Sequence, residues 1–220
     1  MLKLKLFKTM DTVERLIASK LLQINAIKLQ PDVPFTWASG WKSPIYCDNR
    51  KTLSYHDVRT AIKTALTNLV TTHFPAATAI AGVATGAIAH GALVADALEL
   101  PFVYIRAKPK DHGLETMIEG ELRLDAKVVV VEDLVSTGGS SLKVVQDLRA
   151  FGCKVLGMVA IFTHGFPIVD QRFKEANVPL YTLSNYNAVV EEALRIEYIY
   201  DDDMVILNEW RKDPANWSPK

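Results

Sequence analysis

The sequence predicts an α/β protein in which a central parallel sheet is flanked by helices. Short apolar runs alternate with amphipathic segments along the chain, which is typical of strands alternating with helices. Runs such as Val128–Val131 are apolar at every position, as expected for strands covered on both faces. The chain has 220 residues, of which 49% are hydrophobic, so it can bury a sizeable core. We therefore expect a single domain over residues 1–220.

Six segments have the apolar spacing of amphipathic helices. The first is Thr12–Lys28, which we expect to end before Pro31 and Pro34. The others are residues 56–72, the segment from Gly86 through Leu98, and residues 140–150, 185–195 and 203–212. Gly152 fits the end of the fourth helix, because helices commonly finish with a glycine.

The predicted strands of the sheet lie between these helices. They are residues 77–84, 101–105, 128–131, 154–163 and 180–183. Residues 35–50 are aromatic and rich in turns, which favours a small separate β element. Ligands bind at the carboxyl ends of parallel strands, so the residues that follow the strands are the candidates for a site. They are Thr85-Gly86, Arg106 onward, Glu132–Ser141 and Thr163 onward.

Composition excludes several classes of protein. The formal net charge is zero, which argues against a general nucleic-acid or anionic-membrane surface. Cys47 and Cys153 are too few for a disulfide framework and lack metal-ligand spacing. Lys3, Lys5 and Lys8 interrupt the apolar start, and no apolar run approaches membrane-spanning length. We expect a cytoplasmic protein.

The stretch VVVVEDLVSTGGSS, Val128–Ser141, combines a strand with a loop suited to a phosphate. Backbone N–H groups at the start of a helix have no internal partner and favour an anion. Gly138 and Gly139 allow close approach of the backbone. The loop is not a Walker A motif, because no lysine follows the glycines. The alternative is an ordinary strand–turn–helix with a serine N-cap.

Two acids, Glu132 and Asp133, precede this loop at the expected strand end. Carboxylates repel phosphate, but they bind sugar hydroxyls and, directly or through water, magnesium. A ribose 5-phosphate accounts for both halves of the stretch, with the phosphate on the loop and the hydroxyls on the acids. The alternative is a solvated strand end.

A basic segment, RAKPKDHGLETMIEG, follows the strand that ends before Arg106. Arg106, Lys108, Lys110 and His112 cluster there, and the segment is too charged for the core and too irregular for a helix. We expect a lid that binds an anion such as diphosphate. The alternative is a basic surface loop.

These motifs together resemble orotate phosphoribosyltransferases. The strand, acid pair and loop resemble the phosphoribosyl diphosphate (PRPP) signature of type I phosphoribosyltransferases. Arg-x-Lys-Pro-Lys-x-His-Gly resembles the catalytic loop of the orotate family, and FTWASGWKSPIYCDNR, Phe35–Arg50, resembles its N-terminal element. The resemblance runs from about the first helix to the last strand. It implies a type I phosphoribosyltransferase fold with a small N-terminal β hood that includes residues 30–50.

The resemblance also implies an activity. The family transfers the phosphoribosyl group of PRPP to orotate, giving orotidine 5′-monophosphate and diphosphate in pyrimidine biosynthesis. Its members are homodimers with shared active sites and use Mg²⁺, which we expect to be held mainly by PRPP and water rather than directly by the protein.

Carried over residue by residue, the resemblance assigns the PRPP-binding stretch to Glu132, Asp133, Leu134, Val135, Ser136, Thr137, Gly138, Gly139 and Ser140. Arg106, Lys110 and His112 would reach the diphosphate from the neighbouring subunit. Ser136 and Tyr46 would contact orotate, and Thr85-Gly86 falls at the turn on the diphosphate side. Lys110, His112 and Asp133 would be catalytic, the cations acting on the leaving diphosphate and the acids on a cationic sugar.

The chain departs from the family at three positions. Ala38, Gly86 and Ala107 stand where some members have a basic residue, so binding is expected to depend more on Lys42 and the lid. His164 and Arg172 are candidates for the orotate carboxylate, although residues in such a loop are usually exposed. Trp210 and Trp217 in the C-terminal tail are expected to dock on the body of the protein.

Two alternatives share part of this pattern. A phosphoribosyltransferase for a purine or uracil would have the PRPP loop but usually lacks the hood and the Lys-Pro-Lys-x-His lid. A PRPP-sensing regulator without catalysis would be expected to add a basic nucleic-acid face or another domain, which the neutral charge argues against.

Overall fold

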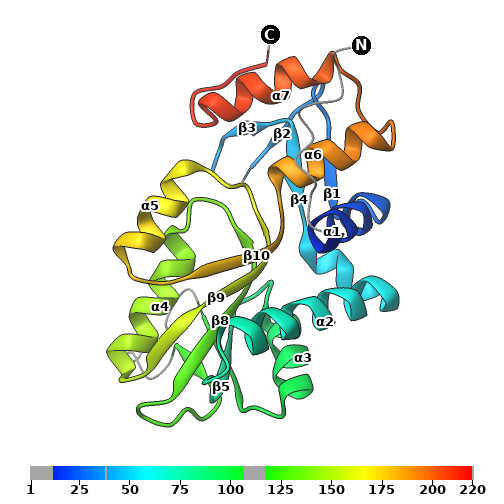
Figure 1. The fold of residues 1–220 in the computed structure, drawn as a ribbon. Coiled ribbons are helices and arrows are strands. Elements are labelled where there is room, and N and C mark those ends of the chain that lie inside the picture. The colour runs from blue at the N-terminus through cyan, green and yellow to red at the C-terminus, as the bar shows by residue number, and fades with distance from the viewer. Residues whose placement is uncertain (1–11, 38, 107–116, 220) are drawn as a thin grey trace.

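The computed structural model describes residues 12–37, 39–106 and 117–219. A six-stranded sheet in the order β10-β9-β8-β5-β6-β7 forms its centre (Figure 1). All neighbouring strands are parallel except β7, which runs antiparallel to β6. The strands are β5 (Ala79–Val83), β6 (Phe102–Ile105), β7 (Ile118–Glu119), β8 (Lys127–Val135), β9 (Lys154–Thr163) and β10 (Leu180–Asn185). The predicted sheet is confirmed, with an antiparallel edge strand that the sequence pattern did not indicate.

Helices cover both faces of the sheet. Figure 1 shows α2 (His56–His73) and α3 (Ile88–Leu98) on one side of the strands and α4 (Gly139–Phe151) on the other. α1 (Thr12–Gln23) packs against β10 and against α6 (Tyr186–Arg195). Within the described ranges, every helix is too short or too polar to traverse a lipid bilayer.

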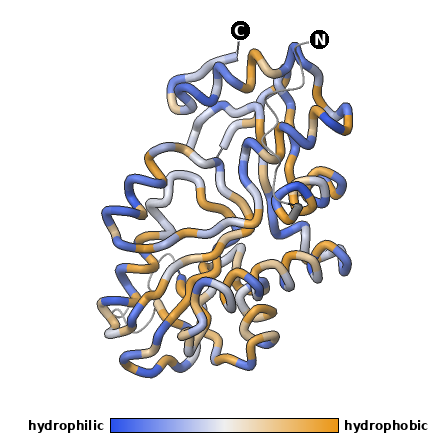
Figure 2. Tube along the Cα trace, viewed as in Figure 1, coloured by the Kyte–Doolittle hydropathy of each residue, from blue (hydrophilic) through white to orange (hydrophobic). Residues whose placement is uncertain are grey.

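The centre of the core is the valine run of β8. Val128, Val129, Val130 and Val131 each have 0% exposure, because helices cover the strand from both sides. Each valine contributes roughly 1.5–3 kcal/mol by its burial. Figure 2 shows this pattern as apolar colour along the central strands and polar colour on the outer turns of the helices. The rigid strand carries the acid pair at its far end.

The predicted small β element is present near the N-terminus. Strands β2 (Phe35–Thr36) and β3 (Lys42–Ser43) pair with each other, and β4 (Ile45–Cys47) pairs with β1 (Ile27–Leu29). A 3₁₀ helix, η1 (Asn49–Ser54), then leads into α2. We call residues 27–47 the hood.

The first helix is shorter than predicted. It ends at Gln23, whereas the apolar pattern predicted a helix to Lys28. Asn25 adopts the left-handed conformation with φ 53°, and the N–H of Ala26 donates to the carbonyl of Leu21 at 2.9 Å, which closes the helix. The buried residues Ile27 and Leu29 belong to β1, and Ile27 continues the helical spacing because it lies three residues after Ile24.

The structure contains a helix that the sequence reading treated as a loop. α5 spans Pro167–Glu175 and starts with proline in its first turn, a recognised signal for a helix start.

α7 (Asp203–Lys212) lies over the hood. Trp210 on this helix is fully buried, so the predicted docking of Trp210 on the body of the protein is confirmed. Trp217 is partly buried against the core.

Candidate functional site

A pocket of about 320 Å³ lies where β5, β6 and β8 end. It is formed by the turn after β5, the residues that flank 107–116, the end of β8 and one face of α4. The residues of the predicted site that it brings together are Thr85, Gly86, Arg106, Glu132, Asp133, Leu134 and Ser140. The pocket therefore lies at the ends of three of the strands where the sequence predicted a site.

The two acids have different surroundings. β8 continues to Val135 rather than stopping at the valines, so the acids lie inside the strand and point to alternate sides. Glu132 is only 5% exposed, and its carboxyl group accepts from the hydroxyl of Ser141 at 2.9 Å and from the N–H of Asp133 at 3.0 Å. Burial, followed by the nearby charge of Asp133, raises the pKa of Glu132 to about 8. The two acids therefore differ in environment, since Glu132 is buried and Asp133 is partly exposed.

The carboxylate of Asp133 packs against the turn after β5. A Cβ atom built on Gly86 would lie 2.2 Å from Oδ2 of Asp133, so any side chain at position 86 would displace the acid. Asp133 is partly exposed, and its carboxylate lines the pocket.

The loop after β8 presents an uncapped helix start. The N-cap of α4 is Gly138, in the left-handed region with φ 79°, and no side chain caps the helix. The alternative of a serine N-cap is therefore wrong. The first N–H groups of α4 remain available to an anion. A side chain on Gly138 would also meet the ring of Phe173 at 2.9 Å, so the glycine is needed for two reasons.

The backbone of this loop is held from the side of β9 and α5. Arg172 donates to the carbonyl of Thr137 at 2.8 Å, and the hydroxyl of Thr163 donates to the carbonyl of Val135 at 3.0 Å. Arg172 lies on α5 and supports the loop from behind, so its placement in an exposed loop was wrong.

His164 is a core residue rather than an exposed one. It is 2% exposed, and its ring lies 4.9 Å from that of Trp37 and 5.5 Å from that of Phe166. Burial, and then the charge of Arg211, lower the pKa of His164 to about 3, so it is neutral. It does not line the pocket described above.

The last strand of the hood, β4, leads into η1, and η1 reaches the acid pair. Tyr46 on β4 is 38% exposed and lies with its ring 5.4 Å from that of Phe35. Asp48 raises the pKa of Arg50 most, and the charges of Tyr46 and Asp133 raise it further. Tyr46 does not line the pocket.

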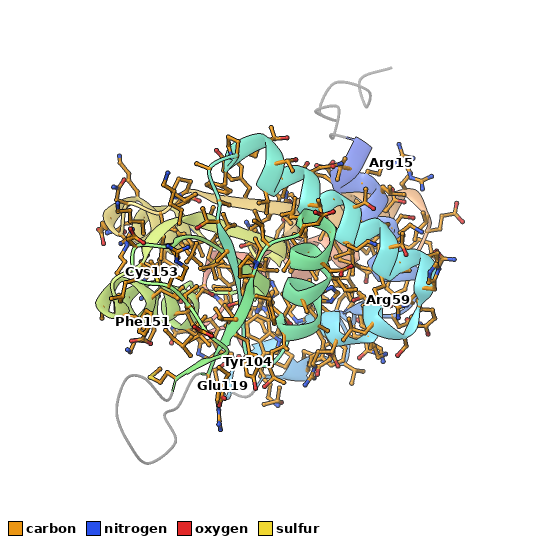
Figure 3. All side chains as sticks on the ribbon, turned by 90° about the horizontal axis from the view of Figure 1, so that it is seen from below. Arg15, Arg59, Tyr104, Glu119, Phe151 and Cys153 are labelled. Atoms are coloured by element: carbon orange, nitrogen blue, oxygen red, sulfur yellow. The ribbon has the colours of Figure 1, made fainter. Side chains whose placement is uncertain are left out.

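Arg106 joins the two strands that flank residues 107–116. The guanidinium of Arg106 pairs with the carboxylate of Glu119 at 3.3 Å. The backbone N–H of Arg106 donates to the backbone carbonyl of Met117 at 2.9 Å. Figure 3 shows Glu119 beside Tyr104, its partner on β6. The remaining lid residues, Lys108, Lys110 and His112, lie outside the described residues, as do the departures Ala38 and Ala107.

The pocket also contains residues that the sequence reading missed. Lys143 and Asp147 on α4 form an ion pair on its wall, and Asp147 is 5% exposed. Their i,i+4 spacing on the predicted helix is the signal that could have revealed them. Among the residues described, no group of three or more His, Cys, Asp or Glu side chains is arranged to hold a metal ion.

Comparison with known proteins agrees with this site. Residues 52–196 match the phosphoribosyl transferase domain family. The orotate phosphoribosyltransferase of Bacteroides fragilis is 66% identical over 208 residues, covering 94% of this chain and 98% of that protein. The orotate phosphoribosyltransferase of Porphyromonas gingivalis is 62% identical over 208 residues, which cover 94% of this chain and 99% of that protein.

A solved structure extends the match to the fold. The crystal structure of orotate phosphoribosyltransferase from Aeropyrum pernix superposes with a TM-score of 0.73 at 25% identity, covering 83% of this chain and 99% of that one. The fold, the PRPP-type loop and the sequence identity agree: the chain belongs to the orotate phosphoribosyltransferase family.

Proposed function

We propose that the protein is an orotate phosphoribosyltransferase, which transfers the phosphoribosyl group of PRPP to orotate and releases diphosphate. The product is orotidine 5′-monophosphate, an intermediate of pyrimidine biosynthesis. The observation that carries this proposal is 66% identity, over nearly the whole chain, to a protein of that name. A cytoplasmic location fits the two free cysteines, Cys47 and Cys153, because disulfides are rare there.

PRPP binds across the carboxyl edge of the sheet in this proposal. The loop Ser136–Ser140 and the uncapped start of α4 hold the 5-phosphate, since their N–H groups lack partners within the helix. Leu134 and Val135 supply the backbone that leads into this loop. Asp133 accepts hydrogen bonds from the ribose hydroxyls, and Glu132 supports it from the buried side. Ser136 and Tyr46 contact orotate.

The diphosphate lies toward Thr85-Gly86 and Arg106. Arg106 lines the pocket together with Thr85 and Gly86 of the turn after β5. By resemblance, Lys110 and His112 add positive charge from the neighbouring subunit of a homodimer. The neutral net charge and the enclosed pocket suit small-molecule substrates rather than nucleic acid.

Mg²⁺ fits this site as an ion carried by the substrate. Asp133 offers oxygen ligands of the kind that Mg²⁺ prefers, whereas Glu132 is engaged with Ser141. Asp133 would hold the ion, mainly through water. When bound, Mg²⁺ supplies positive charge next to the diphosphate.

The protein accelerates the reaction through charge. As the bond from C1 of the ribose to the diphosphate breaks and the bond to N1 of orotate forms, the sugar becomes cationic and the leaving group more anionic. Asp133 stabilises the positive charge on the sugar. The negative charge on the leaving diphosphate is stabilised by Arg106, Lys110 and His112. N1 is already deprotonated in the orotate dianion, so the reaction does not require a strong protein base.

A substrate comparison tests this proposal. Protein, Mg²⁺ and PRPP are mixed with orotate, uracil, hypoxanthine or adenine, and diphosphate release is followed. We expect orotate to be the fastest by a wide margin. Faster turnover of uracil or a purine would replace the orotate assignment, and binding of PRPP without any turnover would favour a PRPP-sensing regulator.

A further inference from the structure

Three buried polar side chains lie beside the acid pair but outside the predicted site. Asn49 and Thr52 on η1 are 1% and 0% exposed, and His90 on α3 is 1% exposed. Burying polar groups is unfavourable unless they are hydrogen-bonded, so such a cluster requires an explanation.

Hydrogen bonds connect the three residues to the backbone of Asp133, and one of the links is the backbone carbonyl of Asn49. The amide of Asn49 donates to the carbonyl of Asp133 at 2.5 Å. The hydroxyl of Thr52 donates to the carbonyl of Asn49 at 2.6 Å, and its oxygen lies 3.1 Å from Nε2 of His90. Because the proton of Thr52 is used on Asn49, His90 must donate to Thr52.

This pattern fixes the state of His90. Burial lowers the pKa of His90, although the charge of Asp133 acts in the opposite direction, so the ring is neutral and has one proton. That proton is on Nε2, since Nε2 is the donor to Thr52. Nδ1 is buried and has no partner among the described residues. The chain of bonds therefore has a single direction, from His90 to Asp133.

The chain ends at a point where the sheet is incomplete. The pairing of β5 with β8 extends only to Gly82 and Val131, because β5 then turns away at Ala84. β8 continues to Val135 while pairing with β9. The amide of Asn49 thus bonds the carbonyl of Asp133 beyond the point where β5 could do so.

We propose that Asn49 is a positioning residue for Asp133 and that Thr52 and His90 hold Asn49 in its place. Asn49 then fixes the backbone of Asp133 at its carbonyl, while the carboxylate of Asp133 packs closely against Gly86. This proposal rests on the proposed function, in which Asp133 faces the ribose. A preorganised acid stabilises the transition state more than bound PRPP, so loss of Asn49 should lower kcat more than PRPP affinity.

The test is Asn49→Asp, which keeps the size of the side chain and replaces its donor with an acceptor. We expect kcat to fall about tenfold to a hundredfold, while KM for PRPP changes by less than about threefold. Thr52→Val removes the hydrogen bond from the hydroxyl of Thr52 to the carbonyl of Asn49 and should also lower kcat. Thr52→Ser keeps the hydroxyl and should recover most of the activity.

The matched control is Thr71→Val. Thr71 on α2 is exposed, and its hydroxyl also donates to the carbonyl of an asparagine three residues earlier, Asn68, at 3.1 Å. It lies outside the site, so kcat should not change. Circular dichroism confirms that each variant is folded.

Several outcomes would overturn the positioning role. The first is a folded Asn49→Asp variant with wild-type kcat. The second is an equal loss of activity in Thr52→Val and Thr52→Ser. The third is that both Asn49→Asp and Thr52→Val fail to fold. The wild-type assay separates this result from the proposed function. If wild-type protein does not convert orotate, the reaction is wrong; if it does and the variants match it, only the positioning role is wrong.

Discussion

Glu132 and Asp133 are adjacent on β8, yet the strand places their carboxyl groups in different environments. Glu132 is enclosed under Ser141, and burial and the charge of Asp133 raise its pKa to about 8. Asp133 stays open to the pocket. Burial therefore disfavours the charged form of Glu132, which lowers the repulsion between this pair and the phosphates of PRPP.

This difference predicts how stability depends on pH. The folded state keeps a proton on Glu132 up to about pH 8, whereas the unfolded chain loses it near the ordinary value of 4.5. The folded state therefore binds more protons in this window, and the contribution of Glu132 to stability falls as pH rises through it. We expect Glu132→Gln to be more stable relative to wild type at pH 9 than at pH 6, with free energies of unfolding measured in urea without ligand.

Glu192→Gln is the matched comparison. Glu192 is also buried, but its hydrogen bonds from Arg195, and the charges of Arg195 and Arg15, lower its pKa. Its carboxylate stabilises the fold at all pH values above the ordinary value, so Glu192→Gln should be less stable than wild type at both pH 6 and pH 9. An equal difference between Glu132→Gln and wild type at the two pH values would contradict the assignment for Glu132.

At the level of elements, the junction between β8 and α4 is the proposed phosphate-binding part of the site. Gly138 turns the chain with a positive φ, and Arg172 and Thr163 hold the backbone on either side of it. The helix then starts without a side-chain cap. Because the conformation is set by neighbouring elements, the loop is preorganised for an anion before PRPP arrives.

Gly138→Ala tests this junction. Alanine is strained at φ 79°, and its methyl group would meet Phe173 at 2.9 Å. We expect a loss of about 1–3 kcal/mol in the free energy of unfolding, together with a higher KM for PRPP. Gly40→Ala is the control for strain alone, because Gly40 has φ 87° and nothing within 4 Å of the added methyl. Equal loss of stability in both variants would mean that the contact with Phe173 has no cost.

Sequence patterns predicted the elements well where local spacing decides them. The alternation of strands and helices is confirmed, and a loop follows β8, although α4 already begins at Gly139. The end of α1 was missed because Ile27 continues its apolar spacing, although Ile27 pairs with β4. Asn49 and Arg172 were missed as supports of the site because their partners, Asp133 and Thr137, are distant in sequence. Contacts of this kind depend on tertiary packing and have no local signal.

For the whole molecule, the strands β2 and β3 of the hood and the helix α7 lie at the same end of the fold (Figure 1). The hood and α7 both lie outside residues 52–196, the part that matches the general phosphoribosyl transferase domain. Trp210 donates to the carbonyl of Lys42 at 3.2 Å, and Arg211 donates to the carbonyl of His164 at 2.6 Å. α7 therefore joins the hood to the loop after β9. The sequence indicated that Trp210 would dock, but not where.

A shared active site would make the dimer, rather than the single chain, the functional unit. By resemblance, Lys110 acts on the PRPP of the neighbouring subunit, whereas Asp133 acts within its own pocket. Lys110→Ala and Asp133→Ala should each give a nearly inactive homodimer. A mixed dimer has one site with the intact pocket of one chain and the intact lid of the other, while its second site has both defects.

Mixing the two inactive variants in equal amounts therefore tests the arrangement. Random exchange makes half of the dimers mixed, each with one intact site of two, so activity should rise to about a quarter of wild type. A lid that served its own chain would leave both sites of a mixed dimer defective, and the mixture would remain inactive. Different affinity tags on the two variants show whether exchange has occurred. Activity that stays flat after a pull-down has demonstrated mixed dimers would exclude the shared site, but the reaction itself would stand, because it depends on the pocket and its substrates rather than on which chain supplies the lid.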